Sequence, residues 1–131
     1  MHFSSHSKYC LIISAMIMCT TTAGAIAGDM AGPDIKKTVS GKTVHVTTSL
    51  GPLPITYHAN GTMKSKSTTI ANLTGVGKDK GLWWISGHKL CQKWTTWLEG
   101  KAHCVSVQRR GNKLMWTGMG GRTGTARISS K

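Results

Sequence analysis

The stretch KLCQKWTTWLEGKAHCVSVQ, residues 89–108, decides the fold that we predict for this chain. Side chains alternate between the two faces of a β-strand, so Leu90 and Trp94 share one face of a first strand and Cys91 takes the other. A second strand, residues 101–108, places Val105 with the first set and Cys104 with the second. The pattern therefore predicts an antiparallel hairpin, with a loop at residues 96–99 and with the two cysteines directly opposite each other.

This hairpin predicts a Cys91–Cys104 disulfide. Opposite positions on neighbouring strands lie within disulfide reach, with Cα atoms about 5.5–6 Å apart. A bridge that closes a loop of this size contributes about 3 kcal/mol to the free energy of unfolding. Because disulfides persist in oxidising compartments, the pair also predicts an exported protein.

The alternation of β-branched and polar residues recurs on both sides of the hairpin. It predicts further strands at residues 43–47, 55–59, 62–67, 82–86, 114–117 and 123–129, and a weaker one at 70–73. Glycine-containing pairs mark the turns, at residues 60–61, 87–88, 111–112 and 120–121. Short strands at this spacing are typical of an all-β domain, here a small antiparallel barrel or sandwich of about eight strands.

Three other segments are predicted as a turn, a loop and a short helix. The prolines of residues 51–54 indicate a turn, and the glycines and lysines of residues 75–81 indicate a flexible basic loop. That loop lacks the glycine spacing and the following helix of a dinucleotide-binding motif, and it lacks the Gly-Lys-Ser/Thr of a phosphate-binding loop. A short helix is expected within residues 28–40, capped by Asp29 or Asp34, with Pro33 in its first turn and Gly41 after its end.

The first 27 residues have the pattern of a secretory signal peptide. One firm positive charge, Lys8, precedes an apolar run at residues 10–18, and small residues allow cleavage after Ala25 or Ala27. The run is too short for a membrane span, which needs about 20 apolar residues. We therefore predict residues 28–131 as a single mature domain that is periplasmic or secreted. Cleavage also removes Cys10 and Cys19, so only the Cys91–Cys104 pair remains.

The mature chain is strongly basic. The sequence has 17 Lys and Arg against 4 Asp and Glu, a formal net charge of +13, and the loss of Lys8 leaves +12. This charge excludes an acidic tail and favours anionic partners. Export favours polysaccharide, lipopolysaccharide, lipid headgroups or an acidic protein over nucleic acid, although nucleic acid fits the charge equally well. The alternative is a structural envelope protein without a specific ligand, whose charge only keeps it soluble.

Five tryptophans lie within residues 83–116, interleaved with lysines and arginines. Aromatic side chains among cations on a small barrel can form a stacking surface for a ligand, whereas Trp84, Trp94 and Trp116 are expected to fill the core. Trp97, and whichever of Trp83 or Trp84 points outward, are left for a surface role. The candidate ligand-binding residues are Lys78, Lys80, Trp83, Trp97, Arg109, Arg110, Arg122 and Arg127. A binding module should gather its cations on one face beside an exposed tryptophan.

The same residues argue against catalysis, metal binding and a cofactor. The mature domain has only four carboxylates, so a small hydrolase would have to combine a histidine with Asp79 or Glu99. A zinc site would need His88, Cys91, His103 and Cys104 to converge, but neighbouring residues of a strand point to opposite faces. We therefore predict a protein that is not an enzyme, with no metal and no cofactor.

Several segments together resemble a family of small exported alphaproteobacterial proteins of unknown function, of the rhizobial type. The resemblance rests on SGKT at residues 40–43, YHANGTM at 57–63, DKGLWW at 79–84, GHKLCQKW at 87–94, HC at 103–104 and RG at 110–111. The Gly-x-Trp-Trp and Leu-Cys-x-x-Trp motifs carry most of it. It implies an exported all-β domain with no established reaction, and it transfers no functional residues.

Overall fold

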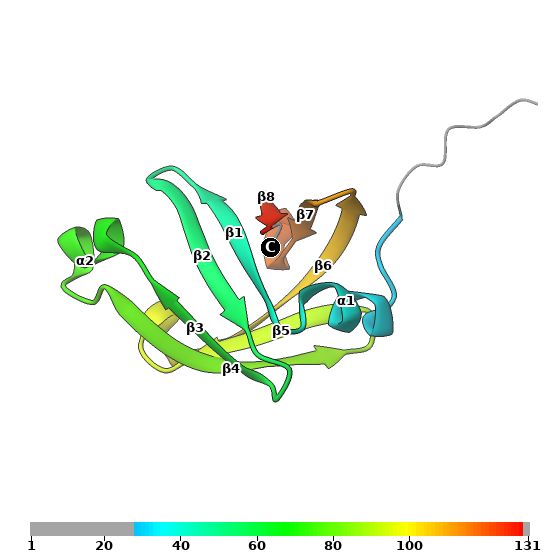
Figure 1. Ribbon diagram of the computed structural model, residues 1–131, viewed down its shortest axis with the longest axis horizontal. Coiled ribbons are helices and arrows are strands. Elements are labelled where there is room, and N and C mark those ends of the chain that lie inside the picture. The colour runs from blue at the N-terminus through cyan, green and yellow to red at the C-terminus, as the bar shows by residue number, and fades with distance from the viewer. Residues whose placement is uncertain (1–27, 130–131) are drawn as a thin grey trace, which may run out of the picture.

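The computed structural model describes residues 28–129, so the predicted signal peptide lies outside the described residues. In this part of the chain, eight antiparallel strands follow one another around a closed barrel (Figure 1). The predicted all-β fold is confirmed, and it is a barrel rather than a sandwich. The strands are β1 (Lys42–Thr48), β2 (Gly51–Tyr57), β3 (Thr62–Lys66), β4 (Lys78–Ser86), β5 (Lys89–Trp94), β6 (Ala102–Arg110), β7 (Lys113–Thr117) and β8 (Thr123–Ile128).

Alternate residues of each strand fill the barrel. The last strand closes the sheet onto the first, where Val44 pairs with Ile128 and Val46 with Ala126. Tyr57 is buried within the barrel, where its hydroxyl donates to Oε1 of Gln92 at 3.0 Å, and burial raises the pKa of this hydroxyl far above its usual range. The other buried strand residues on the inner face are Ile55, Met63, Ser65, Trp83, Leu90, Trp94, Val107 and Leu114.

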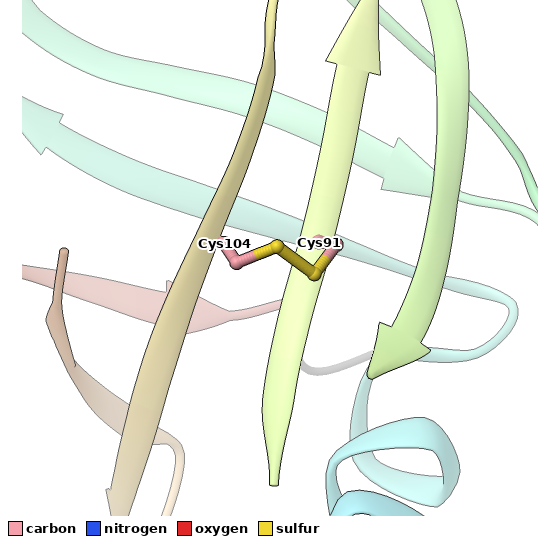
Figure 2. Close-up of a disulfide and its surroundings, with 2 residues drawn as sticks. All are labelled: Cys91 and Cys104. Carbon is pink, nitrogen blue, oxygen red and sulfur yellow. A yellow bond between two sulfur atoms is a disulfide. The ribbon is translucent and has the colours of Figure 1, made fainter. Parts of the chain in front are cut away.

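The predicted cysteine hairpin is confirmed, register included. Cys91 pairs with Cys104 and Lys93 with Ala102 across β5 and β6. The two cysteines are joined by a disulfide, with their Cα atoms 4.0 Å apart (Figure 2). Their side chains lie on the outer face of the sheet, opposite to the inward face of Leu90 and Trp94, so the bridge ties two wall strands together from outside.

Two of the predicted connections are shorter than expected. Residues 51–54 belong to β2, and the turn is shorter, at Ser49 and Leu50. Proline lacks a backbone N–H, so it is tolerated in a strand where no partner needs that group. The carbonyl of Pro54 faces β3, where it accepts from the hydroxyl of Ser65, and an N–H at Pro54 would face the same way. Because β2 pairs with β3 only from Ile55 onward, no backbone hydrogen bond is lost at Pro54. The expected loop at 75–81 is also shorter, because β4 already begins at Lys78.

The weak strand predicted at residues 70–73 is instead part of a helix, α2 (Thr68–Thr74). Its two ends carry ordinary helix signals. The hydroxyl of Ser67 accepts from the N–H of Ile70 at the start, and Gly75 follows the helix with a φ of 77°. Gly77 then packs beneath the helix, where a Cβ would come within 2.5 Å of the Cβ of Ala71.

The predicted N-terminal helix is α1 (Gly32–Val39), which covers one end of the barrel (Figure 1). Neither Asp29 nor Asp34 caps it, because Ala31 occupies the N-cap position. Instead, the first N–H of the helix, that of Gly32, donates to Nδ1 of His88 in the β4–β5 turn at 3.3 Å. The helix buries Ile35 and Val39 against the barrel.

The opposite end of the barrel carries α2 and two short 3-10 turns, η1 (Trp97–Gly100) and η2 (Met119–Gly121). Figure 1 shows α1 and α2 at opposite ends of the molecule. In contrast to α1, helix α2 contains no buried residue. The end that carries α2 is called the mouth of the barrel below.

Candidate ligand-binding surface

Five exposed lysines share the outer face of three neighbouring strands. We call this surface the lysine face, and it comprises Lys64, Lys66, Lys78, Lys80 and Lys93. Lys64 lies directly opposite Lys80, and Lys66 lies directly opposite Lys78, across the β3–β4 pair. The intervening residues point inward, as the burial of Met63 and Ser65 shows. The face therefore follows from strand alternation and register.

Directly opposed like charges destabilise a sheet, since their Cβ atoms are only about 4.5–5.5 Å apart. Among the described residues of β3, β4 and β5, Asp79 is the one carboxylate, and it lies on the inward side between Lys78 and Lys80. Neither lysine pair therefore has an acidic neighbour on the same face of these strands. The lysine face therefore carries two like-charge contacts that no carboxylate on the same face of these strands compensates.

Two exposed apolar side chains extend the lysine face along β4. Leu82 is 57% exposed and lies opposite Lys93, and Trp84 is 39% exposed and lies opposite Cys91. Because Cys91 is bonded to Cys104, the strand beside Trp84 is held firmly to its neighbour. The lysine face thus ends in an outward-facing indole with a supported backbone.

The roles expected for the neighbouring tryptophans Trp83 and Trp84 are reversed. Trp83, predicted as a ligand-binding residue, is only 4% exposed and packs edge-on against Tyr57, with ring centroids 5.7 Å apart. Its indole N–H donates to the carbonyl of His58 at 2.8 Å. Trp84, predicted in the core, is the outward one. Trp94 is buried as predicted, and Trp116 is half-buried.

The candidate arginines do not join the lysine face. Arg109 points toward the end covered by α1, where it donates to the Gly111 carbonyl at 2.7 Å and to the Thr38 hydroxyl at 3.2 Å. Arg110 and Arg127 both lie directly opposite Lys113, and these three cations form a second basic row on β6, β7 and β8. Arg122 follows η2 near the mouth.

The four carboxylates of the described chain are engaged away from the lysine face or lie on helix α1. Asp79 accepts from the backbone N–H groups of Thr96 and Trp97, both at 2.8 Å, and from that of Lys80 at 2.9 Å. Burial alone would raise the pKa of Asp79, but these N–H groups lower it below its usual value. Glu99 pairs with Lys101 at 2.8 Å. Asp29 accepts from Gln108, and Asp34 lies in the first turn of α1.

An apolar cavity of about 480 Å³ opens at the mouth of the barrel. We call it the mouth pocket, and sequence analysis assigned only Trp97 of its lining to a surface role. Trp94 and Trp97 meet there at a ring-centroid distance of 5.0 Å. The sequence signals that could have revealed it are Ser67 and Gly75, which cap helix α2. This helix brings apolar residues to the end of the barrel. The lining residues are Leu50, Leu53, Ile70, Leu73, Thr74, Val76, Trp94, Thr96, Trp97 and Leu98.

Most of the groups considered for catalysis or metal binding have other partners. Cys91 and Cys104 are oxidised to the disulfide, so neither is a free thiolate. His88 accepts from Gly32, and Nε2 of His45 lies 2.6 Å from the Ser129 hydroxyl. Within residues 28–129, no three His, Cys, Asp or Glu side chains come together as metal ligands. The helices of the same residues are all too short or too polar to cross a bilayer.

The fold and the surface together define a class of protein, an eight-stranded antiparallel barrel with a helix over one end, an apolar pocket at the other and a lysine-rich outer face. Comparisons of the chain with protein-family models, with curated proteins and with solved structures find no match. The resemblance to small exported alphaproteobacterial proteins therefore stays a prediction.

Proposed function

We propose that this protein is an exported, non-catalytic binding domain that holds an anionic ligand on the lysine face. The observation that carries the proposal is the pair of directly opposed lysine contacts, Lys64 with Lys80 and Lys66 with Lys78, beside the exposed Trp84. A bound carboxylate, phosphate or sulfate between the strands would turn this repulsion into attraction. Polysaccharide, lipopolysaccharide, lipid headgroups and acidic protein all carry such groups.

Export supports the anionic classes found outside the cytoplasm. The Cys91–Cys104 disulfide and the absence of a helix long enough to span a bilayer within residues 28–129 agree with an exported protein. The exposed indole of Trp84 adds a flat apolar surface on which a sugar ring can stack next to the charges. The lysine face therefore suits a ligand with repeated anionic groups.

The proposal is tested by binding of dextran sulfate to the protein, with neutral dextran as the matched ligand. The double variant Lys64→Ala/Lys80→Ala should weaken binding about 30-fold, at about 1 kcal/mol for each lysine. Affinity of the unaltered protein should fall as salt rises, because the Debye length shrinks from about 10 Å at 0.1 M to about 3 Å at 1 M.

The control variant removes the same charge from the second basic row, as Arg110→Ala/Lys113→Ala, and should leave the affinity within about threefold of the original, or about 0.6 kcal/mol. Equal losses in the two variants would show that only the overall charge matters. That result would favour the alternative of a structural envelope protein without a specific ligand.

A further inference from the structure

The mouth pocket presents almost only carbon to a ligand. Its walls come from three separate segments of the chain, within residues 50–53, 70–76 and 94–98, which converge at the mouth. At about 480 Å³ it falls within the range of small-molecule sites, roughly 300–1,000 Å³, and barrel mouths are a common place for such sites. The pocket is therefore large enough for part of a small molecule.

Several polar groups of the wall already have hydrogen-bond partners within the protein. The indole N–H of Trp97 donates to the Val76 carbonyl at 3.1 Å, and the Thr74 hydroxyl donates to the Ile70 carbonyl at 2.9 Å. The N–H groups of Thr96 and Trp97 are held by Asp79. A ligand inside the pocket thus meets no free donor on these groups, which selects for a hydrocarbon portion.

Helix α2 is incomplete without something against its apolar side. It has seven residues, none of them buried, and an isolated helix of this length is unstable in water. Leu73 is 65% exposed although it lines the pocket, and Leu98 in the facing turn is 56% exposed. An occupant of the pocket would cover both leucines.

The backbone of η1 is strained where it presents Leu98. Leu98 and Glu99 both adopt left-handed conformations, with φ values of 54° and 58°, and neither is a glycine. A non-glycine residue in this region is held there by its surroundings and often marks a functional site. Here the strain places a leucine at the rim of an apolar cavity.

Two lysines of the lysine face lie beside the same helix. Lys66 ends β3 just before α2, and Lys78 begins β4 two residues after Val76, which lines the pocket. The two lysines are directly opposite each other. An apolar cavity and an uncompensated pair of cations therefore adjoin at α2.

We propose that the mouth pocket binds the acyl chain of a free, single-chain anionic amphiphile, whose carboxylate or phosphate group lies at Lys66 and Lys78. The assignment of the charged group rests on the proposed function of the lysine face, whereas the assignment of the acyl chain rests on the pocket alone. The ligand is a monomeric lipid molecule rather than a bilayer surface.

The test uses sodium dodecanoate below its micelle concentration, followed by calorimetry and by the indole N–H resonances of the tryptophans. We expect one molecule to bind per protein and the resonance of Trp97 to shift. The variants Leu73→Gln and Leu98→Gly should each weaken binding at least tenfold. Lys66→Ala/Lys78→Ala should weaken dodecanoate binding but leave the weaker binding of 1-dodecanol unchanged.

Matched controls separate the pocket from its surroundings. Glu99→Gly relieves the same kind of backbone strain as Leu98→Gly but keeps the pocket wall. Met119→Gln replaces an apolar residue that is 86% exposed on η2 and does not line the pocket. Both controls should bind dodecanoate within about twofold of the unaltered protein, or about 0.4 kcal/mol.

Three results would overturn the inference. The first is a dodecanoate-induced shift of the Trp84 resonance alone. The second is binding to vesicles of phosphatidylglycerol and phosphatidylcholine without binding of monomeric dodecanoate. The third is a dimer in sedimentation whose formation is abolished by Leu98→Gly. If dodecanoate fails and dextran sulfate still binds at Lys64 and Lys80, the inference falls and the proposed function stands. If dodecanoate and dodecanol bind equally well and the lysine variants have no effect, the charged group is wrongly assigned.

Discussion

The two ends of the barrel carry helices of similar length that differ in how much of their apolar surface they bury. Helix α1 buries Ile35 and Val39 and closes its end, whereas α2 buries nothing and leaves a cavity beside it. Full burial of an aliphatic side chain contributes about 1.5–3 kcal/mol, so the α1 end gains more stability from its helix than the mouth gains from α2. The contrast teaches that the helix at one end completes the core, whereas the helix at the other end leaves an open apolar pocket.

Polar contacts follow the same division. At the α1 end, His88 of the β4–β5 turn accepts from the N–H of Gly32, and Arg109 of β6 donates to the hydroxyl of Thr38. At the mouth, the carboxylate of Asp79 holds the N–H groups of the η1 turn rather than those of the helix. The mouth is thus fixed on the η1 side, and α2 is attached mainly through its own ends.

The largest effect is expected from removing the Cys91–Cys104 disulfide, which lies in the wall between the two ends. The double variant Cys91→Ala/Cys104→Ala should lower the free energy of unfolding by about 3 kcal/mol, because the reduced chain regains the entropy of a loop that spans 13 residues in sequence. Chemical denaturation measures the loss, and reduction of the unaltered protein should reproduce it. An unchanged denaturation midpoint would show that the barrel does not depend on the bridge.

A second change breaks the α1 end alone. A Cβ at Gly32 would lie 2.2 Å from the carbonyl oxygen of Gly87 and 2.7 Å from Cγ2 of Ile85, so Gly32→Ala must displace the helix. We expect a loss of about 2 kcal/mol in the free energy of unfolding, typical of overpacking. Gly28→Ala is the control, since nothing lies within 4 Å of its Cβ. Dodecanoate binding at the mouth should survive at temperatures where the variant is still folded.

A third change loosens the mouth. Asp79→Asn removes the charged acceptor of the η1 turn and should lower the free energy of unfolding by about 1 kcal/mol. The loss is smaller than for a fully buried charge-assisted hydrogen bond because the carboxylate is partly solvated. The folded-state pKa of Asp79 lies below its unfolded value of about 3.9. Its contribution is therefore complete above that value and lost as the pH falls through the folded-state pKa. The stability difference between variant and original should vanish on acidification, and a constant difference would contradict this assignment.

The smallest expected effect is a gain, rather than a loss, in the free energy of unfolding. Lys80→Glu replaces a repulsive contact with Lys64 by an ion pair and should stabilise the protein by about 0.5 kcal/mol while weakening dextran sulfate binding. Lys113→Glu changes the net charge equally and faces Arg110 and Arg127, so it should stabilise the protein without loss of binding. If Lys80→Glu binds as well as the original, the lysine face is not the anion site.

Much of the wall was predictable because it rests on local patterns. The register of Cys91 and Cys104 follows from strand parity and loop length alone, and the structure confirms it. Residues 70–73 were predicted wrongly because four residues can suit either a strand or a helix. The Ser67 cap and the glycine at residue 75 decide for the helix, and both signals were present in the chain.

The candidate site was less predictable. Lys78 and Lys80 were chosen from their sequence neighbourhood, but their partners Lys64 and Lys66 come from another strand, and only the pairing of β3 with β4 brings the four together. Arg109 was grouped with them by charge, yet it serves the docking of α1. The outward tryptophan could not be selected either, since Trp83 and Trp84 are neighbours with equal claims to the core.

By itself, the sequence determined the strands, the disulfide, the basic charge and the presence of a helix before the barrel, because alternation, cysteine parity and composition act over a few residues. Only the tertiary structure decided that the sheet closes, that Trp84 faces outward, that lysines oppose one another and that the mouth stays hollow. These features depend on which strands become neighbours and on which end each helix covers, and both are set by packing between residues far apart in the chain.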